Sequence, residues 1–184
     1  MKKTPVKKLR GKRISLRPPT PADFREYAAL MKVSKPVFRE LLQAFTGRKQ
    51  FNGYLRRCNR DDAYGFLMCR REDGAVVGAI SLFNIVRLHV QNGIVGYFVG
   101  APHVRRGYAT EALQLVLRFA FRKLKLHRVE ASIQPHNAAS IALVKRAGFA
   151  REGFSRRLVK IAGQWRDHER WAILAEDWHP LRRP

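Results

Sequence analysis

The chain has 184 residues, of which 46% are hydrophobic and 28% are charged. This composition excludes general disorder, and the length predicts one domain with a sizeable hydrophobic core. Lys and Arg number 37 against 14 Asp and Glu, so the formal net charge is +23. A field of this sign attracts polyanions such as RNA, although simple solubility is an equal explanation.

The chain carries no sequence sign of a metal site, of export or of membrane insertion. Its two cysteines, Cys58 and Cys69, have no second pair and no histidine cluster beside them, which predicts no zinc and a reduced, cytoplasmic setting. The basic N-terminus is not followed by an apolar run of signal-peptide length. No stretch approaches the roughly 20 consecutive apolar residues that a membrane span needs.

The first third of the chain is predicted to contain a basic arm, one strand and three helices. Thr20 and Asp23 have the spacing of a capping box, and Pro21 occupies the first helical position. Pro36 is expected to open the second helix and Gly47 to end it. In chain order the segments are a flexible arm at 1–13, a strand at 14–17, and helices at 20–31, 36–47 and 50–59.

Beyond residue 63 the pattern alternates between strands and helices. Glu72, Asp73 and Gly74 form a turn signal between two apolar strands, which predicts a hairpin. A helical stripe is formed by Ala109, Ala112, Leu113, Val116, Ala120 and Leu124. The further elements are a strand at 93–99, a strand at 128–134, a short helix capped by Asn137 and closed by Gly148, and strands at 154–161 and 168–175. This order predicts an α/β (α+β) fold, a mixed sheet with helices on both faces.

The segment HVRRGYATE, residues 103–111, is the strongest candidate for a binding site. It lies between a strand and the long helix, where unpaired backbone N–H groups and the helix dipole favour an anion. Gly107 allows close approach of a phosphate, and Arg105 and Arg106 add positive charge. The segment matches neither GxGxxG nor GxxxxGK[ST], so a dinucleotide fold and a nucleoside triphosphatase are not predicted. Many strand-to-helix connections of similar composition bind nothing, and that alternative stays open.

The same segment resembles a known phosphate loop. VRRGYATEAL is similar to the acetyl-coenzyme A pyrophosphate loop of the GNAT acetyltransferase superfamily, Gln/Arg-x-x-Gly-x-Gly/Ala, from which Val104 departs at the first position. The stretch from Asn137 to Phe149 resembles the second motif of that superfamily. RVEASIQPHNAASIALVKRAGFAREGF and GQWRDHERWAIL resemble the RimJ/RimL branch, and its RimJ type, the ribosomal-protein-alanine N-acetyltransferases, more closely. The likeness spans about residues 14–179, which implies a GNAT domain at 14–184 after the extension at 1–13.

The resemblance implies transfer of an acetyl group from acetyl-CoA to the N-terminal α-amine of a ribosomal or other protein, without a covalent enzyme intermediate and without a metal. It implies no association with a membrane, a possible location near RNA through the basic surface, and either a monomer or a homodimer. The cofactor-binding residues that it implies are Tyr97, Phe98 and Val99 for the pantetheine arm, Val104, Arg105, Arg106, Gly107, Tyr108, Ala109 and Thr110 for the pyrophosphate, Asn137 as a hydrogen-bond partner, and Lys145 for the outer phosphate.

The proton-transfer residues are less clear. Many GNAT enzymes carry a tyrosine acid where this chain has Val144, so Ser140 is the candidate catalytic acid by analogy with RimL; alternatively it is a small first-turn residue. No base is evident, because Glu111 fits a helix-dipole partner and Glu152 a surface residue, while His136 fits an exposed loop histidine. An α-amine, with a pKa of roughly 7.7 to 8.0 against ~10.4 for lysine, is partly neutral without a strong base.

Two other functions remain open at this point. One is acetylation of a small-molecule amine, for which Asp61 and Asp62 could provide a local acidic pair. The other is a non-catalytic protein that binds CoA or RNA on a GNAT scaffold. The three tryptophans are interpreted as core residues rather than as a wall of the acceptor groove; they are Trp165, Trp171 and Trp178.

Overall fold

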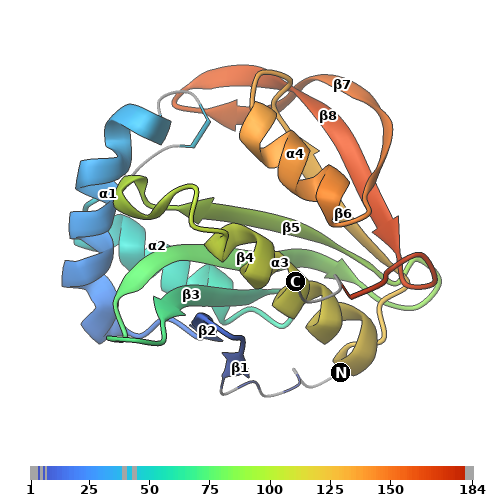
Figure 1. Ribbon diagram of the computed structural model, residues 1–184. Helices are drawn as coiled ribbons and strands as arrows, with labels where there is room; N and C mark the ends of the chain where they lie inside the picture. Colours follow the sequence, from blue (N-terminus) through green and yellow to red (C-terminus); the bar gives the residue numbers. More distant parts are fainter. Residues whose placement is uncertain (1–3, 5, 7, 39–40, 43–44, 181–184) are drawn as a thin grey trace.

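The computed structural model describes residues 4, 6, 8–38, 41–42 and 45–180. Its centre is an eight-stranded mixed sheet with the order β1-β2-β3-β4-β5-β6-β8-β7 (Figure 1). The strands are β1 (Leu9–Arg10), β2 (Ile14–Arg17), β3 (Tyr64–Arg70), β4 (Val76–Val86), β5 (Asn92–Val99), β6 (Arg128–Ile133), β7 (Ala150–Ile161) and β8 (Gln164–Leu174). The helical segments are η1 (Pro21–Asp23), α1 (Phe24–Phe38), α2 (Arg48–Cys58), η2 (Ala101–His103), α3 (Tyr108–Arg118), the π-helical turn η3 (Phe119–Lys123) and α4 (Ala138–Arg146).

Helices cover both faces of this sheet, as predicted (Figure 1). One core forms beneath α3 and α4, where Leu113, Val116 and Val144 pack against strand residues such as Val129. The other core forms beneath α1 and α2. Its largest fully buried side chains are Tyr27, Met31, Phe51 and Leu67. The sheet therefore separates two hydrophobic layers.

The sheet opens between its two parallel strands, β5 and β6. They pair only from Asn92–Ile94 to Arg128–Glu130. Beyond Ile94, β5 stays paired with β4 as far as Val99, and β6 stays paired with β8 as far as Ile133. The two halves of the sheet thus diverge like a V, which Figure 1 shows as the space between β5 and β6.

The predicted second helix is wrong where the structure describes it. Helix α1 continues through Pro36 to Phe38, and residues 41, 42 and 45–47 are not helical; residues 39, 40, 43 and 44 lie outside the described part. A proline removes one backbone hydrogen bond from a helix, and this loss is small here because Pro36 lies only two residues before the end of α1. The buried stripe of α1 outweighs that loss, because packing of an apolar face supplies most helix stability in proteins. Gly47 is the N-cap of α2 and ends no helix.

The basic arm also differs from the expectation of a flexible segment. Leu9–Arg10 forms strand β1, which pairs with β2 through Leu9 to Leu16 and Arg10 to Ser15. Val6 and Leu9 pack against the core beneath α3. Apolar residues at these two positions therefore anchor an otherwise cationic segment; residues 1–3, 5 and 7 lie outside the described part of the chain.

The C-terminal hairpin is longer than predicted, because β7 begins at Ala150 and β8 at Gln164. Trp171 and Trp178 are buried in the core, as expected, whereas Trp165 is 58% exposed near the tip of the hairpin. In the described residues, no helix has the length and apolarity to cross a membrane. The same residues contain no group of three or more His, Cys, Asp or Glu side chains that could hold a metal ion.

Candidate active site

A cleft of about 790 Å³ occupies the opening between β5 and β6. This volume lies in the range of small-molecule and cofactor sites, roughly 300 to 1,000 Å³. One wall comes from β4 and β5, and the other from β6, the start of α4 and the β7–β8 hairpin. Polar lining residues from these elements include Ser81, Tyr97, Ser132, Gln134, Asn137, Ser140 and His168.

Asn137 and Ser140 meet at the N-terminus of α4. The Oδ1 atom of Asn137 accepts a hydrogen bond of 3.1 Å from the backbone N–H of Ser140, which confirms the predicted cap. Both residues line the cleft. Because Oδ1 is engaged in the cap, a ligand in the cleft would meet chiefly the Nδ2 donor of Asn137.

Tyr97 brings a buried hydroxyl group to the same part of the cleft. Its oxygen has no hydrogen-bond partner among the described residues. Burial raises the pKa of Tyr97 to about 12, and the nearby Ser140 side chain opposes only part of that shift. The phenol therefore remains protonated at neutral pH. A buried donor without a partner is costly, so this hydroxyl is suited to a hydrogen bond with a bound ligand.

The turn before α3 has the conformation of an anion cradle. Gly107 is the N-cap of α3 with φ +74°, and Arg105 has φ +60°, so two left-handed residues precede the helix. The helical bonds begin with the N–H of Glu111, which donates to the Gly107 carbonyl at 3.2 Å. The N–H groups of Tyr108, Ala109 and Thr110 precede this bond, and a helix offers its first N–H groups no internal partner. These groups fit an anion such as a pyrophosphate.

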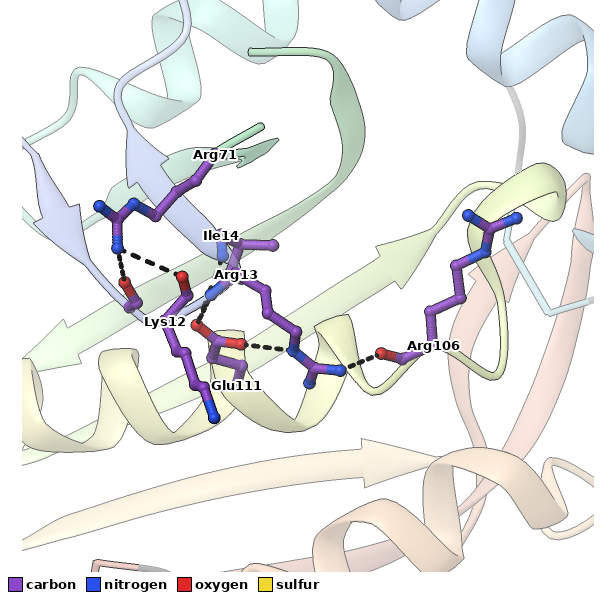
Figure 2. Close-up of polar contacts among 7 residues, drawn as sticks. Lys12, Arg13, Ile14, Arg71, Arg106 and Glu111 are labelled. Atoms are coloured by element: carbon purple, nitrogen blue, oxygen red, sulfur yellow. Dashed lines mark hydrogen bonds and ion pairs between the residues drawn. The ribbon is translucent and has the colours of Figure 1, made fainter. Parts of the chain in front are cut away.

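An arginine and a glutamate that are 98 residues apart hold this turn against β2 (Figure 2). Glu111 accepts hydrogen bonds from the backbone N–H groups of Arg13 at 2.9 Å and Ile14 at 3.4 Å. It also accepts one from Arg13 Nε at 3.2 Å, while Arg13 Nη1 donates to the Arg106 carbonyl at 2.7 Å. A Cβ at Gly107 would lie 2.8 Å from Arg13 Nη2. Glu111 thus has a bridging role beyond the predicted helix dipole, and Arg13 fills the space beside the glycine.

His168 is a cleft residue that the sequence did not reveal. It lies on β8 opposite Ser155, and its side chain is buried, with 4% exposure. Its Nδ1 atom is 3.0 Å from the Arg166 carbonyl oxygen. Because a carbonyl oxygen only accepts, this contact requires a proton on Nδ1, and in the neutral imidazole Nε2 is then the acceptor nitrogen. His136, which the sequence suggested as a loop histidine, is exposed and does not line the cleft.

The end of the cleft beneath α1 and α2 is aromatic. Tyr27 stacks on Phe45 and on Tyr54, in each case with 5.6 Å between ring centroids. The Tyr54 hydroxyl is a second buried group without a hydrogen-bond partner among the described residues. Leu41 and Leu42 complete this apolar wall.

The rim of the aromatic end is charged. Arg57, Arg60 and Asp62 line it, and Arg60 Nε and Nη2 donate to the two carboxylate oxygens of Asp62 at 2.8 and 2.9 Å. Asp61, the other half of the predicted acidic pair, does not line the cleft. The negative charge of Asp62 is therefore matched by a neighbouring guanidinium.

Several predicted site residues lie elsewhere. Of the three predicted strand residues, Tyr97 and Phe98 line the cleft, whereas Val99 packs against the core beneath α3. Lys145 is exposed on α4, with Nζ 5.6 Å from the centroid of the Trp171 ring. Residues 104–110 form the turn and first helical residues described above, next to the cleft in the chain but not among its lining residues.

Glu152, which the sequence left as one of the remaining carboxylates, is bound in an ion pair. Arg128 Nη1 donates to it at 2.8 Å, and Arg128 Nη2 makes a second bond. These bonds from Arg128 lower the pKa of Glu152. A carboxylate that is paired and acidified in this way is a poor proton acceptor, which agrees with its interpretation as a surface residue.

Comparisons with known proteins agree with this geometry. A diverging pair of parallel strands, a left-handed glycine turn before a helix and a second helix capped over the opening define an acetyltransferase of the GNAT type. A family model described as an acetyltransferase (GNAT) domain matches residues 13–150. The chain belongs to this family and is an N-acetyltransferase; enzymes of this family use acetyl-CoA.

Three relatives that match most of the chain or its larger part are N-acetyltransferases by name or RimJ proteins. The chain is 36% identical over 177 residues to the probable N-acetyltransferase YjcK of Bacillus subtilis (strain 168), covering 92% of this chain and 98% of that protein. It is 33% identical over 120 residues to the ribosomal protein uS5-alanine N-acetyltransferase of Escherichia coli (strain K12), covering 65% and 62%. The solved structure of Mycobacterium smegmatis RimJ in complex with CoA-disulfide superimposes with a TM-score of 0.80 at 26% identity, covering 98% of this chain and 88% of that one.

Proposed function

We propose that this protein transfers the acetyl group of acetyl-CoA to the N-terminal α-amine of a protein, a ribosomal protein in the cytoplasm. The observation that carries the proposal is the cleft between the diverging strands, which joins a set of hydrogen-bond donors at α4 to an aromatic end with an arginine rim. The named activity of the uS5-alanine N-acetyltransferase supports the choice of acceptor.

The cofactor fits the donor groups on the β5 side of the cleft. Beyond Ile94 the edge of β5 that faces β6 is free of strand pairing, so Tyr97–Val99 would offer backbone groups to the pantetheine arm. The turn at 104–110 would hold the pyrophosphate, and Asn137 Nδ2 would donate to the ligand. Tyr97 supports this fit, because its buried hydroxyl lacks a partner. When bound, acetyl-CoA supplies the thioester-linked acetyl group.

His168 is the proposed general base. The contact of Nδ1 with the Arg166 carbonyl leaves Nε2 of the neutral ring to accept the amine proton, and the residue lines the cleft. An α-amine loses that proton far more readily than a lysine does, since its reference pKa is roughly 7.7 to 8.0 against ~10.4. A single buried imidazole is therefore sufficient for an N-terminus.

Ser140 is the proposed acid, as the sequence suggested. Its hydroxyl would hold the proton that the leaving sulfur takes when the new amide bond replaces the thioester bond. Burial raises the pKa of Tyr97, and the Ser140 side chain lies close enough to lower it in part. Because burial keeps the pKa of Tyr97 high, its phenol would act as a fixed donor beside Ser140.

The charges at the acceptor end favour a peptide over a cationic small molecule. A polyamine or an aminoglycoside needs free carboxylates, and the cleft-lining carboxylate, Asp62, already holds Arg60. Arg57 adds a further positive charge to the rim. A peptide N-terminus needs only one neutral amine, and its first side chain can pack against Tyr27 and Phe45.

The proposal is tested by acetyl transfer from labelled acetyl-CoA to peptides with free Ala, Ser, Thr or Met N-termini. N-terminally blocked peptides that contain lysine, together with spermidine and an aminoglycoside, are the matched controls. We expect turnover only with free N-termini. Turnover confined to the small amines contradicts the proposal. If acetyl-CoA binds but no acetyl group is transferred, either to the peptides or to intact ribosomal subunits, the protein is a non-catalytic binding protein.

A further inference from the structure

A second concavity, separate from the acetyl-transfer cleft, lies near the β1 edge of the sheet. It has a volume of about 300 Å³ and shares no lining residue with the cleft. Five of its eight lining residues are cationic, and none of the eight is acidic. These residues are Lys8, Arg10, Ser15, Arg17, Cys69, Arg70, Arg71 and Gly74. We call this feature the basic concavity.

Strand register explains why the charges converge there. Arg10 pairs with Ser15, and Ser15 pairs with Cys69, so these three residues form a row across β1, β2 and β3. Side chains two positions apart share a face of a strand, so Arg17 lies on the same face of β2 as Ser15. Ser15 and Cys69 are only 2% and 4% exposed. The floor of the concavity is thus buried, while long cationic side chains rise around it.

The arginines of the basic concavity are held in place by neighbouring groups. Arg17 Nη1 donates to Asp23 Oδ2 at 2.8 Å, and Arg70 Nε donates to Asp73 Oδ1 at 3.0 Å. Arg71 Nη1 donates to the carbonyl oxygens of Gly11 at 3.0 Å and Lys12 at 3.2 Å (Figure 2). Fixed guanidinium groups lose little side-chain entropy when they bind an anion.

The positive charge exceeds the negative charge available nearby. Asp23 and Asp73 neutralise two of the five cations. For the other three, which are Lys8, Arg10 and Arg71, the described residues provide no ion pair. The backbone carbonyls that hold Arg71 carry no net charge. Glu26 also lies close enough to act electrostatically on Cys69. The basic concavity therefore has an excess of about two positive charges, which an external anion would offset.

We propose that the basic concavity binds a phosphate group of a nucleic-acid backbone. Planar guanidinium groups match the oxygens of a phosphate, and charge-assisted bonds of this kind are strong. Exposed Lys12 and Arg13 continue this positive surface toward the turn before α3, because Arg71 contacts the Lys12 carbonyl and Arg13 contacts the Arg106 carbonyl (Figure 2). A surface of this length fits a chain of phosphates better than a single small anion. The lining contains no large apolar side chain, which disfavours a lipid surface.

The test is fluorescence anisotropy with a labelled single-stranded RNA of about 12 nucleotides, titrated from about 50 to 200 mM KCl. The test variant is K8E/R10E, since both side chains are exposed. The matched control is R156E/K160E, which changes the net charge equally on β7, the opposite edge strand of the sheet. Circular dichroism and thermal unfolding verify that both variants are folded.

We expect K8E/R10E to weaken RNA binding at least about tenfold, and to flatten the dependence of log affinity on log salt by about 1.4, the loss of two phosphate contacts. The control should change affinity less than about threefold. A DNA strand of the same sequence should bind equally, because the backbone is recognised. Equal weakening by both variants, or no binding by the folded wild-type protein, would overturn the proposal.

Two further measurements separate a nucleic acid from a free anion and the basic concavity from the acetyl-CoA site. Millimolar inorganic phosphate that displaces the RNA completely at constant ionic strength would identify a free-anion site and contradict the nucleic-acid proposal. Acetyl-CoA affinity should be unchanged in K8E/R10E, since neither side chain contacts the turn at 104–110. The outcome is therefore independent of whether the proposed acetyl transfer is confirmed.

Discussion

The proposed cofactor site, which combines the β5 side of the cleft with the turn before α3, consists mainly of backbone groups, whereas the acceptor side of the cleft consists of side chains. On the first side, the edge of β5 and the turn before α3 offer N–H and C=O groups whose positions depend on Gly107. On the second side, Tyr27, Phe45 and His168 shape the wall. A site built from backbone tolerates exchange of side chains but not of conformation. A site built from side chains is sensitive to the exchange of single residues and tolerates small changes of backbone conformation.

The largest effect is expected from G107E on the backbone side. A side chain there meets Arg13 Nη2 at 2.8 Å and introduces a negative charge into the phosphate cradle. Acetyl-CoA affinity, measured by calorimetry, should fall about 100-fold or more, because charge repulsion and displacement of the turn act together. The matched control is G163E, since Gly163 has φ +84° with nothing within 4 Å of its Cβ position. Unchanged affinity in G107E would remove the turn from the cofactor site.

The next effect is expected from H168Q on the side-chain side. Loss of the acceptor nitrogen should lower peptide turnover about 10- to 100-fold, at or just below the low end of the range for general-base catalysis, because an α-amine is partly neutral without a base. Acetyl-CoA affinity should stay within about twofold, because His168 belongs to the acceptor wall. H136Q, which changes an exposed histidine outside the cleft, should leave both quantities unchanged. Full turnover in H168Q would leave water as the proton acceptor.

S140A tests the junction of the two sides. If Ser140 supplies the proton, kcat should fall about tenfold while acetyl-CoA affinity changes little. Equal losses in both quantities would make Ser140 a binding residue. Y97F is the companion variant: because the pKa of Tyr97 is about 12, its effect on kcat should be the same across about pH 7 to 9. An effect of Y97F that varies across this range would contradict a phenol that stays protonated.

R13A tests whether the clamp on the turn contributes to the cofactor site. Loss of the bonds to Arg106 and Glu111 should weaken acetyl-CoA about fivefold, the value of roughly one hydrogen bond. K12A removes the same charge from the neighbouring residue without removing a contact to the turn, and it should bind normally. Equal weakening in both variants would indicate a general charge effect, which higher salt would abolish.

The smallest effect is expected from D23N, which concerns the anchor of α1 on the acceptor side. Burial alone would raise the pKa of Asp23, but hydrogen bonds from Arg17 and Thr20 lower it overall. A lowered pKa in the folded state stabilises the protein above the unfolded value of ~3.9 and loses this effect as the pH falls. Unfolding at pH 7 should show a loss of about 1 kcal/mol in D23N. The difference in unfolding free energy between the wild-type protein and D23N should shrink in acid. A difference that stays constant with pH would contradict the ion pair.

The same contrast explains what the sequence could predict. Asn137 beside Ser140, and Gly107 before a helical stripe, are local signals: Asn137 caps α4 as predicted, and the predicted long helix, α3, begins directly after Gly107. His168 gave no local signal, because its place in the cleft depends on how β8 pairs with β6 and β7. The bridge between Arg13 and Glu111 spans 98 residues and has no sequence pattern. Helix α1 was predicted to end too early, because the buried stripe that carries it past Pro36 depends on packing against the sheet.

The central claim, acetyl transfer to an N-terminal α-amine, is tested most directly by internal competition within one peptide. The acceptor carries a free N-terminal alanine and one lysine, and fragment mass spectrometry locates the acetyl group after partial reaction with the wild-type enzyme. We predict that the label lies on the α-nitrogen and that H168Q slows its appearance without moving it. Label on the lysine nitrogen would contradict the account.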